Sequence, residues 1–226
     1  MPYFTKATFT FLKDLKDNNE REWFHENKDR YEDHVRDPAT RFIMDFGAHL
    51  KTLSEHFRSD PRKVGGSMFR IHRDTRFSKD KTPYKTFIGI QFRHALGKDA
   101  HAPGYYLHIE RDGCFAGAGM WHPDSPSLRN IREAIVEDPQ AWKRTIGAKR
   151  FRDTYVLEGD RLKRPPRGFD PDHPLVEDLK RKDFIGVAQL PQKMITDPKL
   201  PEELTRILRA GTPLVEFLCS AVDVPF

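Results

Sequence analysis

The sequence predicts an α+β fold: a mainly antiparallel sheet of four to six strands, with helices from both ends of the chain packed on one of its faces. Apolar residues recur at helical spacing in 5–58 and again in 124–222, whereas they alternate with polar residues across 67–120. Asp112-Gly113 separates two alternating runs and is a strong signal for a two-residue hairpin. The chain of 226 residues is expected to form a single domain over 1–226, helical in 5–58, with its sheet core in 67–120 and helical or mixed in 124–222.

Three helices are predicted in the first part. Thr5 is expected to cap the first helix, which ends at Asn18-Asn19. Asn19 is expected to cap the second, and Asp37 the third, where Pro38 takes the first helical position and its missing N–H costs nothing. Their apolar faces are formed by Phe4, Phe11, Leu12 and Leu15, then Phe24, Tyr31 and Val35, then Phe42, Ile43, Phe46, Leu50, Leu53 and Phe57.

Four strands are predicted in the middle part, as an antiparallel meander over 67–73, 86–93, 104–111 and 114–120, with 95–103 as a longer hairpin connection. Alternation places Phe69, Ile71, Ile88, Ile90, Phe92, Leu107 and Ile109 on the core face. The opposite face receives Arg70, His72, Lys85, Phe87, Gly89, Gln91, Tyr106, His108 and Glu110. The run Ala116-Gly117-Ala118-Gly119 is small, so this face is expected to have a shallow floor where a ligand could sit.

The second half is predicted to be mainly helical. Helices are expected from Pro126 and from Asp138-Pro139, followed by a small hairpin over 155–162 that turns at Gly159-Asp160. The Pro-rich run 163–174 is expected to cross the surface as a strap. A short helix over 176–180, a strand over 183–190, and two closing helices over 201–209 and 213–222, divided at Gly211-Thr212, complete the prediction.

The loop RDTRFSKDKTPYK, residues 73–85, is the strongest functional signal. It holds five basic and two acidic side chains within thirteen residues. Arginine forks match phosphate or carboxylate, so the loop and the polar sheet face predict a pocket for a small anion. The expected ligand-binding residues are Arg70, His72, Arg73, Asp74, Arg76, Ser78, Lys79, Asp80, Lys81, Tyr84, Lys85, Gln91, Tyr106, His108 and Glu110. Alternatively, Asp74 and Asp80 pair with the arginines, and the loop is a self-satisfied ion-pair network.

Three functions are consistent with this pocket. The leading hypothesis is binding of a small phosphorylated or carboxylated ligand. A second is a hydrolase or transferase in which His72 or His108 is the general base, with Asp74 as a further candidate, and arginines stabilise anionic charge. A third is a nucleic-acid-binding module, which the formal net charge of +5 permits but the mixed-sign composition of 39 basic and 34 acidic residues does not favour.

No cofactor or metal ion is expected. The chain has neither GxxxxGK[ST] nor GxGxxG. His72, Asp74, His108 and Glu110 could converge on a metal, but two histidines on adjacent strands are more often hydrogen-bonded or exposed. Cys114 and Cys219 lie far apart without a CxxC pair and are expected to be unbonded.

The N-terminus lacks the basic start and apolar run of a signal peptide, and no stretch approaches the ~20 apolar residues of a membrane span. These features predict a soluble, cytoplasmic protein without a membrane partner.

The sequence resembles an uncharacterised bacterial and fungal family, known as a conserved domain of unknown function. The resemblance rests on Asn18-Asn19, Arg21, Trp23-Phe24, Lys28, Tyr31, Phe69-Arg70-Ile71, Arg73-Asp74-Thr75-Arg76-Phe77-Ser78, Asp80-Lys81, Pro83-Tyr84-Lys85, Tyr105-Tyr106, His108, Gly117, Gly119 and Pro166-Arg167-Gly168-Phe169. It extends over nearly the whole chain and implies one full-length domain of about this size. It implies no substrate, reaction or catalytic residue.

Overall fold

The computed structural model describes residues 1–97 and 101–226 and confirms the α+β fold. Its sheet has five strands, all paired antiparallel, in the order β1-β2-β3-β5-β4. The strands are β1 (Ile88–Arg93), β2 (Gly104–Ile109), β3 (Cys114–Met120), β4 (Val156–Glu158) and β5 (Phe184–Leu190). The helices are α1 (Lys6–Asp17), α2 (Arg21–Glu26), α3 (Lys28–Tyr31), the π-helix η1 (Glu32–Arg36), α4 (Asp37–Lys51), α5 (Ser125–Glu137), α6 (Pro139–Gly147), α7 (Lys149–Thr154), α8 (Val176–Leu179), α9 (Gln192–Ile195) and α10 (Leu200–Ala221).

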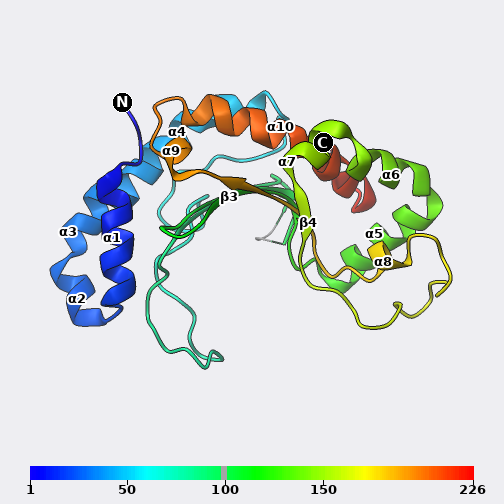
Figure 1. Cartoon of the computed structure of the whole chain (residues 1–226), viewed down its shortest axis with the longest axis horizontal. Coiled ribbons are helices and arrows are strands. Elements are labelled where there is room, and N and C mark those ends of the chain that lie inside the picture. The colour runs from blue at the N-terminus through cyan, green and yellow to red at the C-terminus, as the bar shows by residue number, and fades with distance from the viewer. Residues whose placement is uncertain (98–100) are drawn as a thin grey trace.

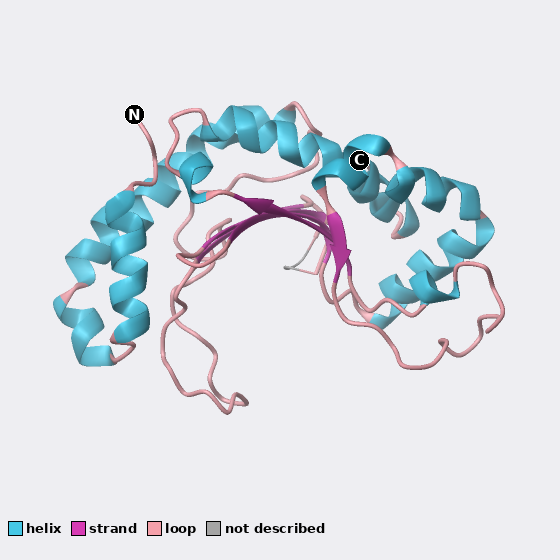
Figure 2. Cartoon of the chain, viewed as in Figure 1, coloured by secondary structure: helices cyan, strands magenta, loops and turns pink. Residues whose placement is uncertain are grey.

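The sheet is curved, and helices from both halves of the chain cover its convex side. Figure 1 shows α4 and α10 lying over the strands, with α1–α3 beside one end of the sheet and α5–α8 beside the other. Phe92 of β1 packs against Phe46 of α4, and Gly211 of α10 approaches Ala118 of β3. Long loops descend at both ends on the concave side (Figure 2). The concave side is therefore the one on which polar side chains can gather.

The N-terminal helices form as predicted, but two of their caps differ. Thr5 caps α1 in a reciprocal arrangement with Thr8. Asn19 does not cap α2; its side chain binds the main chain of Tyr84 instead. Asp37 is not a cap either, because the chain continues from η1 into α4 without a break. A π-turn bond from Asp37 N–H to Glu32 C=O shifts the bonding pattern just before Pro38, which has no N–H to donate.

The predicted meander is confirmed for three of its four strands. β1, β2 and β3 pair in sequence. The connection between β2 and β3 spans 110–113 and is longer than the predicted two-residue turn at Asp112-Gly113. Residues 67–73 do not form a strand, which corrects the prediction. Phe69 N–H donates to Gly89 C=O on β1, but the segment then leaves β1 and pairs near Pro83, which offers no N–H for a continuous ladder. The expected connection 95–103 includes residues 98–100, which lie outside the described residues.

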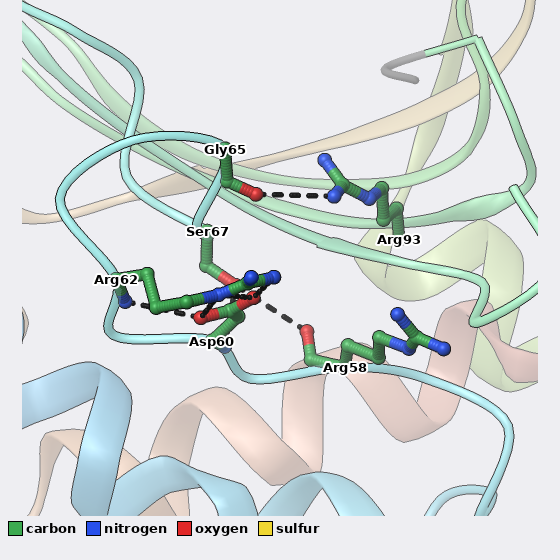
Figure 3. A network of polar contacts seen from close by, with 6 residues as sticks. All are labelled: Arg58, Asp60, Arg62, Gly65, Ser67 and Arg93. Atoms are coloured by element: carbon green, nitrogen blue, oxygen red, sulfur yellow. Dashed lines mark hydrogen bonds and ion pairs between the residues drawn. The ribbon is translucent and has the colours of Figure 1, made fainter. Parts of the chain in front are cut away.

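A compact network of polar contacts fixes the chain just before this extended segment (Figure 3). The Asp60 carboxylate binds the Arg62 guanidinium. The Asp60 main-chain N–H donates to the Ser67 hydroxyl, and the Ser67 N–H donates to Asp60 C=O. Arg93 of β1 donates to Gly65 C=O at 3.1 Å. This network therefore holds the start of the extended segment against the end of β1.

The core face follows the predicted alternation, with one exception. Ile71, Ile88, Ile90, Phe92, Leu107 and Ile109 are buried. Phe69 lies on the opposite face, over Gly89 and 5.8 Å from the ring of Tyr106, because 67–73 does not continue the pleat of β1.

Two predictions for the second half are also corrected. The strand β4 pairs with β5, whereas 160–162 lies apart from it, so 155–162 is not a hairpin of its own. The predicted pair of closing helices is the single helix α10. Gly211 does not end a helix; a Cβ there would lie 2.5 Å from the Ala118 Cβ, so glycine permits close packing on the sheet. The short helix and the strand predicted before α10 are confirmed as α8 and β5.

Cys114 and Cys219 are unbonded, as predicted, and both are buried. Among the described residues, no helix is long and apolar enough to cross a membrane.

Candidate functional site

The arginines at the tip of the loop are paired with its own carboxylates. Arg76 binds Asp74 at 2.7 Å, and Arg73 binds Asp80 and the hydroxyl of Thr82. The hydrogen bond from Arg76 lowers the pKa of Asp74 to about 2, and hydrogen bonds from Thr82 and Arg73 lower the pKa of Asp80 to about 2. The ion-pair network considered as an alternative is thus present at the tip.

Two lysines of the loop serve its main chain. Lys85 Nζ donates to the carbonyls of Arg70 and His72, both at 2.8 Å, and burial lowers its pKa. Lys81 Nζ donates to Thr75 C=O at 2.9 Å. These ammonium groups hold the two arms of the loop together.

A hollow between α2 and the loop gathers cationic side chains from two distant parts of the sequence. We call it the basic cleft. Its volume is about 470 Å³, and it is lined by Arg21, Phe24, His25, Lys28, His72, Arg73, Thr75, Pro83 and Tyr84. No carboxylate is among the described residues that line it. The side chains of Arg21, His25 and Lys28 have no hydrogen-bonding or ion-pair partner in the described ranges 1–97 and 101–226. Arg21 and Lys28 therefore present positive charge that no described residue neutralises, whereas Arg73 of the same lining is paired with Asp80.

Local structure explains why these groups meet. Arg21, His25 and Lys28 are spaced i, i+4 and i+7, which places them on one face of the helical segment α2–α3. Asn19 ties the main chain of Tyr84 to the start of this segment, with hydrogen bonds of 2.9 and 3.0 Å. The Tyr84 ring stacks on Phe24 at 4.1 Å. The helix and the loop are thus locked face to face.

The basic cleft continues into a second hollow of about 340 Å³ that shares Phe24, Lys28 and His72 with it. Arg70 lines this hollow, opposite Arg36, whose guanidinium binds Glu32 at 3.4 Å. On the other side of the loop, Arg73 also lines a hollow of about 580 Å³ together with Asp74, Asp80 and Lys85. This last hollow mixes both signs of charge.

The concave face of the sheet holds a different kind of hollow, which we call the concave pocket. Its volume is about 350 Å³, and its walls include Phe69, Phe87, Tyr106, Phe115 and Trp121. Glycines of β2 and β3 form the floor, as the sequence predicted from the run 116–119. No Lys or Arg is among the described residues that line it. This pocket is therefore aromatic rather than basic.

A hydrogen-bonded chain of three predicted residues lies beside the concave pocket. Tyr106 hydroxyl contacts His108 Nδ1 at 3.1 Å, and His108 Nε2 contacts Glu110 at 3.2 Å. The His108 ring lies between Phe87 and Phe115, with centroids 4.4 and 4.5 Å away. Burial lowers the pKa of His108 and raises that of Tyr106. Both ring nitrogens of His108 are occupied, so it is not positioned as an open base.

The structure therefore divides the predicted residues among separate places. His72, Arg73 and Tyr84 line the basic cleft, Arg70 lines the adjoining hollow, and Gln91, Tyr106 and His108 line the concave pocket next to Glu110. Asp74, Arg76, Asp80, Lys81 and Lys85 hold the loop together, and Ser78 and Lys79 lie near its tip. The described residues contain no group of three or more His, Cys, Asp or Glu side chains that could hold a metal ion.

Sequence reasoning left two sets of residues out of the site. Arg21, His25 and Lys28 could have been found from their helical spacing within a charged segment. His122 Nδ1 lies 2.8 Å from Asp183 Oδ1, where β3 ends and β5 begins. They are 61 positions apart, and no local pattern joins them.

A family model described as conserved hypothetical protein (DUF2461) matches residues 7–217. Neither the curated proteins nor the solved structures contain a match to the chain.

Proposed function

The chain belongs to the conserved hypothetical family DUF2461, and we propose that it binds a small phosphorylated or carboxylated ligand in the basic cleft. The observation that carries the proposal is the lining of this cleft: Arg21, Lys28 and Arg73, together with His25 and His72, and no carboxylate among its described residues. A bound anion would supply the missing negative charge.

The energetics of the cleft favour an anion over water alone. A hydrogen bond to a charged group contributes roughly 1.5–3 kcal/mol, about twice that of a neutral one. Arg21 offers a planar fork for phosphate or carboxylate oxygens, and Lys28 offers a point charge. Arg73 also lines the cleft, although it binds Asp80 at the same time. The ring nitrogens of His25 and His72 add further hydrogen-bonding groups.

The size of the cleft favours a small ligand over a polymer. Small-molecule pockets have volumes of about 300–1,000 Å³, and the basic cleft, with about 470 Å³, falls within this range. A nucleic-acid surface would need a stripe of unpaired cations that follows a phosphate backbone. The loop tip instead pairs Arg76 with Asp74 and Arg73 with Asp80.

Titration calorimetry with inorganic phosphate and with pyrophosphate tests the proposal. Lys28→Met and Arg21→Met each keep the aliphatic stem and remove the charge. Each is expected to weaken binding about tenfold or more, since tenfold corresponds to about 1.4 kcal/mol. Lys143→Met is the matched control, because Lys143 is an exposed residue of α6, at the other end of the molecule (Figure 1).

Three outcomes would contradict the proposal. Neither anion binds the parent protein, or Lys143→Met weakens binding as much as Lys28→Met, or a short oligonucleotide binds far more tightly than pyrophosphate with an affinity that falls steeply with salt. The last result would favour the nucleic-acid alternative.

A further inference from the structure

We propose that His122 is a general base, oriented by Asp183, that acts at the mouth of the concave pocket on an aromatic ester by promoting attack of water. This activity is separate from anion binding in the basic cleft and shares no residue with it.

The pair has the geometry of a base and its orienting carboxylate. His122 Nδ1 lies 2.8 Å from Asp183 Oδ1, and the main-chain N–H of His122 donates to the same oxygen at 2.8 Å. Asp160 N–H donates to the other oxygen at 2.8 Å. Asp183 is only 2 % exposed, so its carboxylate is held in place and fixes the ring of His122.

The other ring nitrogen is free to accept a proton. The His122 side chain is 46 % exposed, and Nε2 has no hydrogen-bond partner among residues 1–97 and 101–226. With Nδ1–H donated to Asp183, Nε2 carries the lone pair and faces water. His108, by contrast, has both ring nitrogens engaged by Tyr106 and Glu110. Of these two histidines, His122 is the one competent to remove a proton.

The backbone around the pair is specialised. His122 has φ of 47°, an uncommon conformation for a residue with a side chain. Gly159 has φ of 108°, and a Cβ there would lie 2.4 Å from the Asp183 Cβ. The glycine lets the chain come close enough for Asp160 N–H to reach the buried carboxylate.

The concave pocket can place an aromatic substrate next to this base. His122 stacks on Trp121 with ring centroids 4.1 Å apart, and Trp121 lines the pocket beside Gly119 and Ile185. The Trp121 ring also stacks on His101 at 5.9 Å, yet the residue is 50 % exposed, so a planar ring in the pocket can lie against its uncovered part. A group at the edge of that ring would then lie near His122.

The floor of the pocket is bare at a position where the backbone does not require glycine. At Gly119 a Cβ would meet Phe184 C=O at 2.0 Å, so glycine is obligatory. At Gly117 the nearest atom to a Cβ would be the Tyr106 Cβ at 3.3 Å, which is tight but not prohibitive. Glycine at position 117 therefore avoids this tight contact with Tyr106 and also leaves the floor of the pocket open for a ring.

The proposed reaction consumes only the ester and water. Nε2 of His122 accepts a proton from water while the water oxygen bonds to the acyl carbon. The bond from that carbon to the aryl oxygen then breaks, and the proton returns from the imidazolium to the leaving oxygen. The products are a carboxylic acid and a phenol, and no oxidant or reductant is needed.

Hydrolysis of p-nitrophenyl acetate by the full chain tests the proposal. We expect several nitrophenolate ions released per chain, and a rate about 100-fold lower in His122→Gly, because positioned general bases contribute roughly 10²–10⁴-fold. Glycine tolerates the positive φ and leaves a space that added imidazole should fill, which restores part of the rate. Asp183→Asn should lower kcat about tenfold with little change in KM.

Two further variants complete the test. His34→Gln is the matched control, because His34 lies on η1, away from the concave pocket. The His34→Gln protein is expected to hydrolyse the ester at the parental rate. Gly117→Val should raise KM by filling the floor of the pocket. The proposal is overturned if His122→Gly keeps the parental rate, if imidazole rescues it no better than it rescues His34→Gln, or if the parent releases no more than one nitrophenolate per chain.

Discussion

Carboxylates on two sides of the sheet are held in opposite surroundings. Asp74 and Asp80, in the loop beside β1, have side chains that are 42 % and 57 % exposed, and each pairs with an arginine. Asp183, just before β5, is 2 % exposed and accepts main-chain N–H groups in addition to the His122 ring. Exposed pairs contribute little because water and salt screen them, whereas a buried carboxylate depends on every hydrogen bond it accepts. The loop 73–85 has the highest density of charge in the sequence, but the fold depends more on the single buried carboxylate of Asp183.

The largest effect is expected at the buried carboxylate. Asp183→Ala leaves the N–H groups of His122 and Asp160 without their acceptor, and each unpaired buried group costs about 1–3 kcal/mol. We expect the free energy of unfolding to fall by about 3–5 kcal/mol in urea denaturation. Asp80→Ala should cause a much smaller shift. If Asp183→Ala and Asp80→Ala lower the free energy of unfolding equally, the buried carboxylate is no more important for stability than the exposed one.

A smaller loss is expected where the backbone approaches Asp183. Gly159→Ala places a Cβ in a left-handed conformation and against the Asp183 Cβ. Such strain costs about 1–3 kcal/mol, which should appear as a lower urea midpoint. Gly113→Ala is the control, because a Cβ at Gly113 meets nothing within 4 Å. A Gly159→Ala protein as stable as Gly113→Ala would show that Asp183 does not need this close approach.

On the exposed side, the clearest change should be in acidity. The Arg76 hydrogen bond is the main reason why the pKa of Asp74 is about 2. Because this pKa is lowered in the folded state, the pair stabilises the fold above the ordinary pKa near 4 and loses that contribution as the pH falls toward 2. Arg76→Met should raise the pKa of Asp74 toward its ordinary value, as measured by NMR titration of the carboxyl carbon. Asp80 serves as the internal reference and should not change.

The smallest effect is expected on overall stability. The Arg76 side chain is 76 % exposed, so its pair with Asp74 is strongly screened. Thermal unfolding of Arg76→Met should coincide with that of the parent at physiological salt. A clear fall in the melting temperature would mean that the loop tip is a structural clamp.

Local patterns in the sequence were sufficient for much of the fold. Alternation in 86–93 and 104–111 identified two strands and the buried face that carries Ile90 and Leu107. The same alternation misled in 67–73, because hydrogen bonding there is divided between β1 and the region of Pro83. Gly211 predicts a break between two helices, but the structure has one helix there, because the contact of Gly211 with Ala118 depends on how α10 packs on the sheet. Hydrophobic periodicity and composition indicate the local structure of a segment, but they do not show which distant segments contact one another.

The same limit applies to the candidate site. Composition identifies the loop as charged, but it does not show that Arg76 pairs with Asp74 while Lys28 has no such partner among the described residues. That difference depends on side-chain directions and on the packing of α2 against Tyr84. The pair His122 and Asp183 arises only once β3 and β5 become neighbours in the sheet.

The irregular segment before β1 has a consequence for how this sheet meets other molecules. Its main chain covers the outer side of β1 through Phe69 N–H to Gly89 C=O and Gln91 N–H to Ser67 C=O, and Arg58 N–H binds Arg93 C=O at the far end. The opposite edge, β4, spans only Val156–Glu158. An exposed, regular edge is a template on which a second chain can add a strand, and proteins blunt such edges by covering or shortening them. In this fold one edge is capped and the other is short, so both resist strand addition and edge-to-edge aggregation.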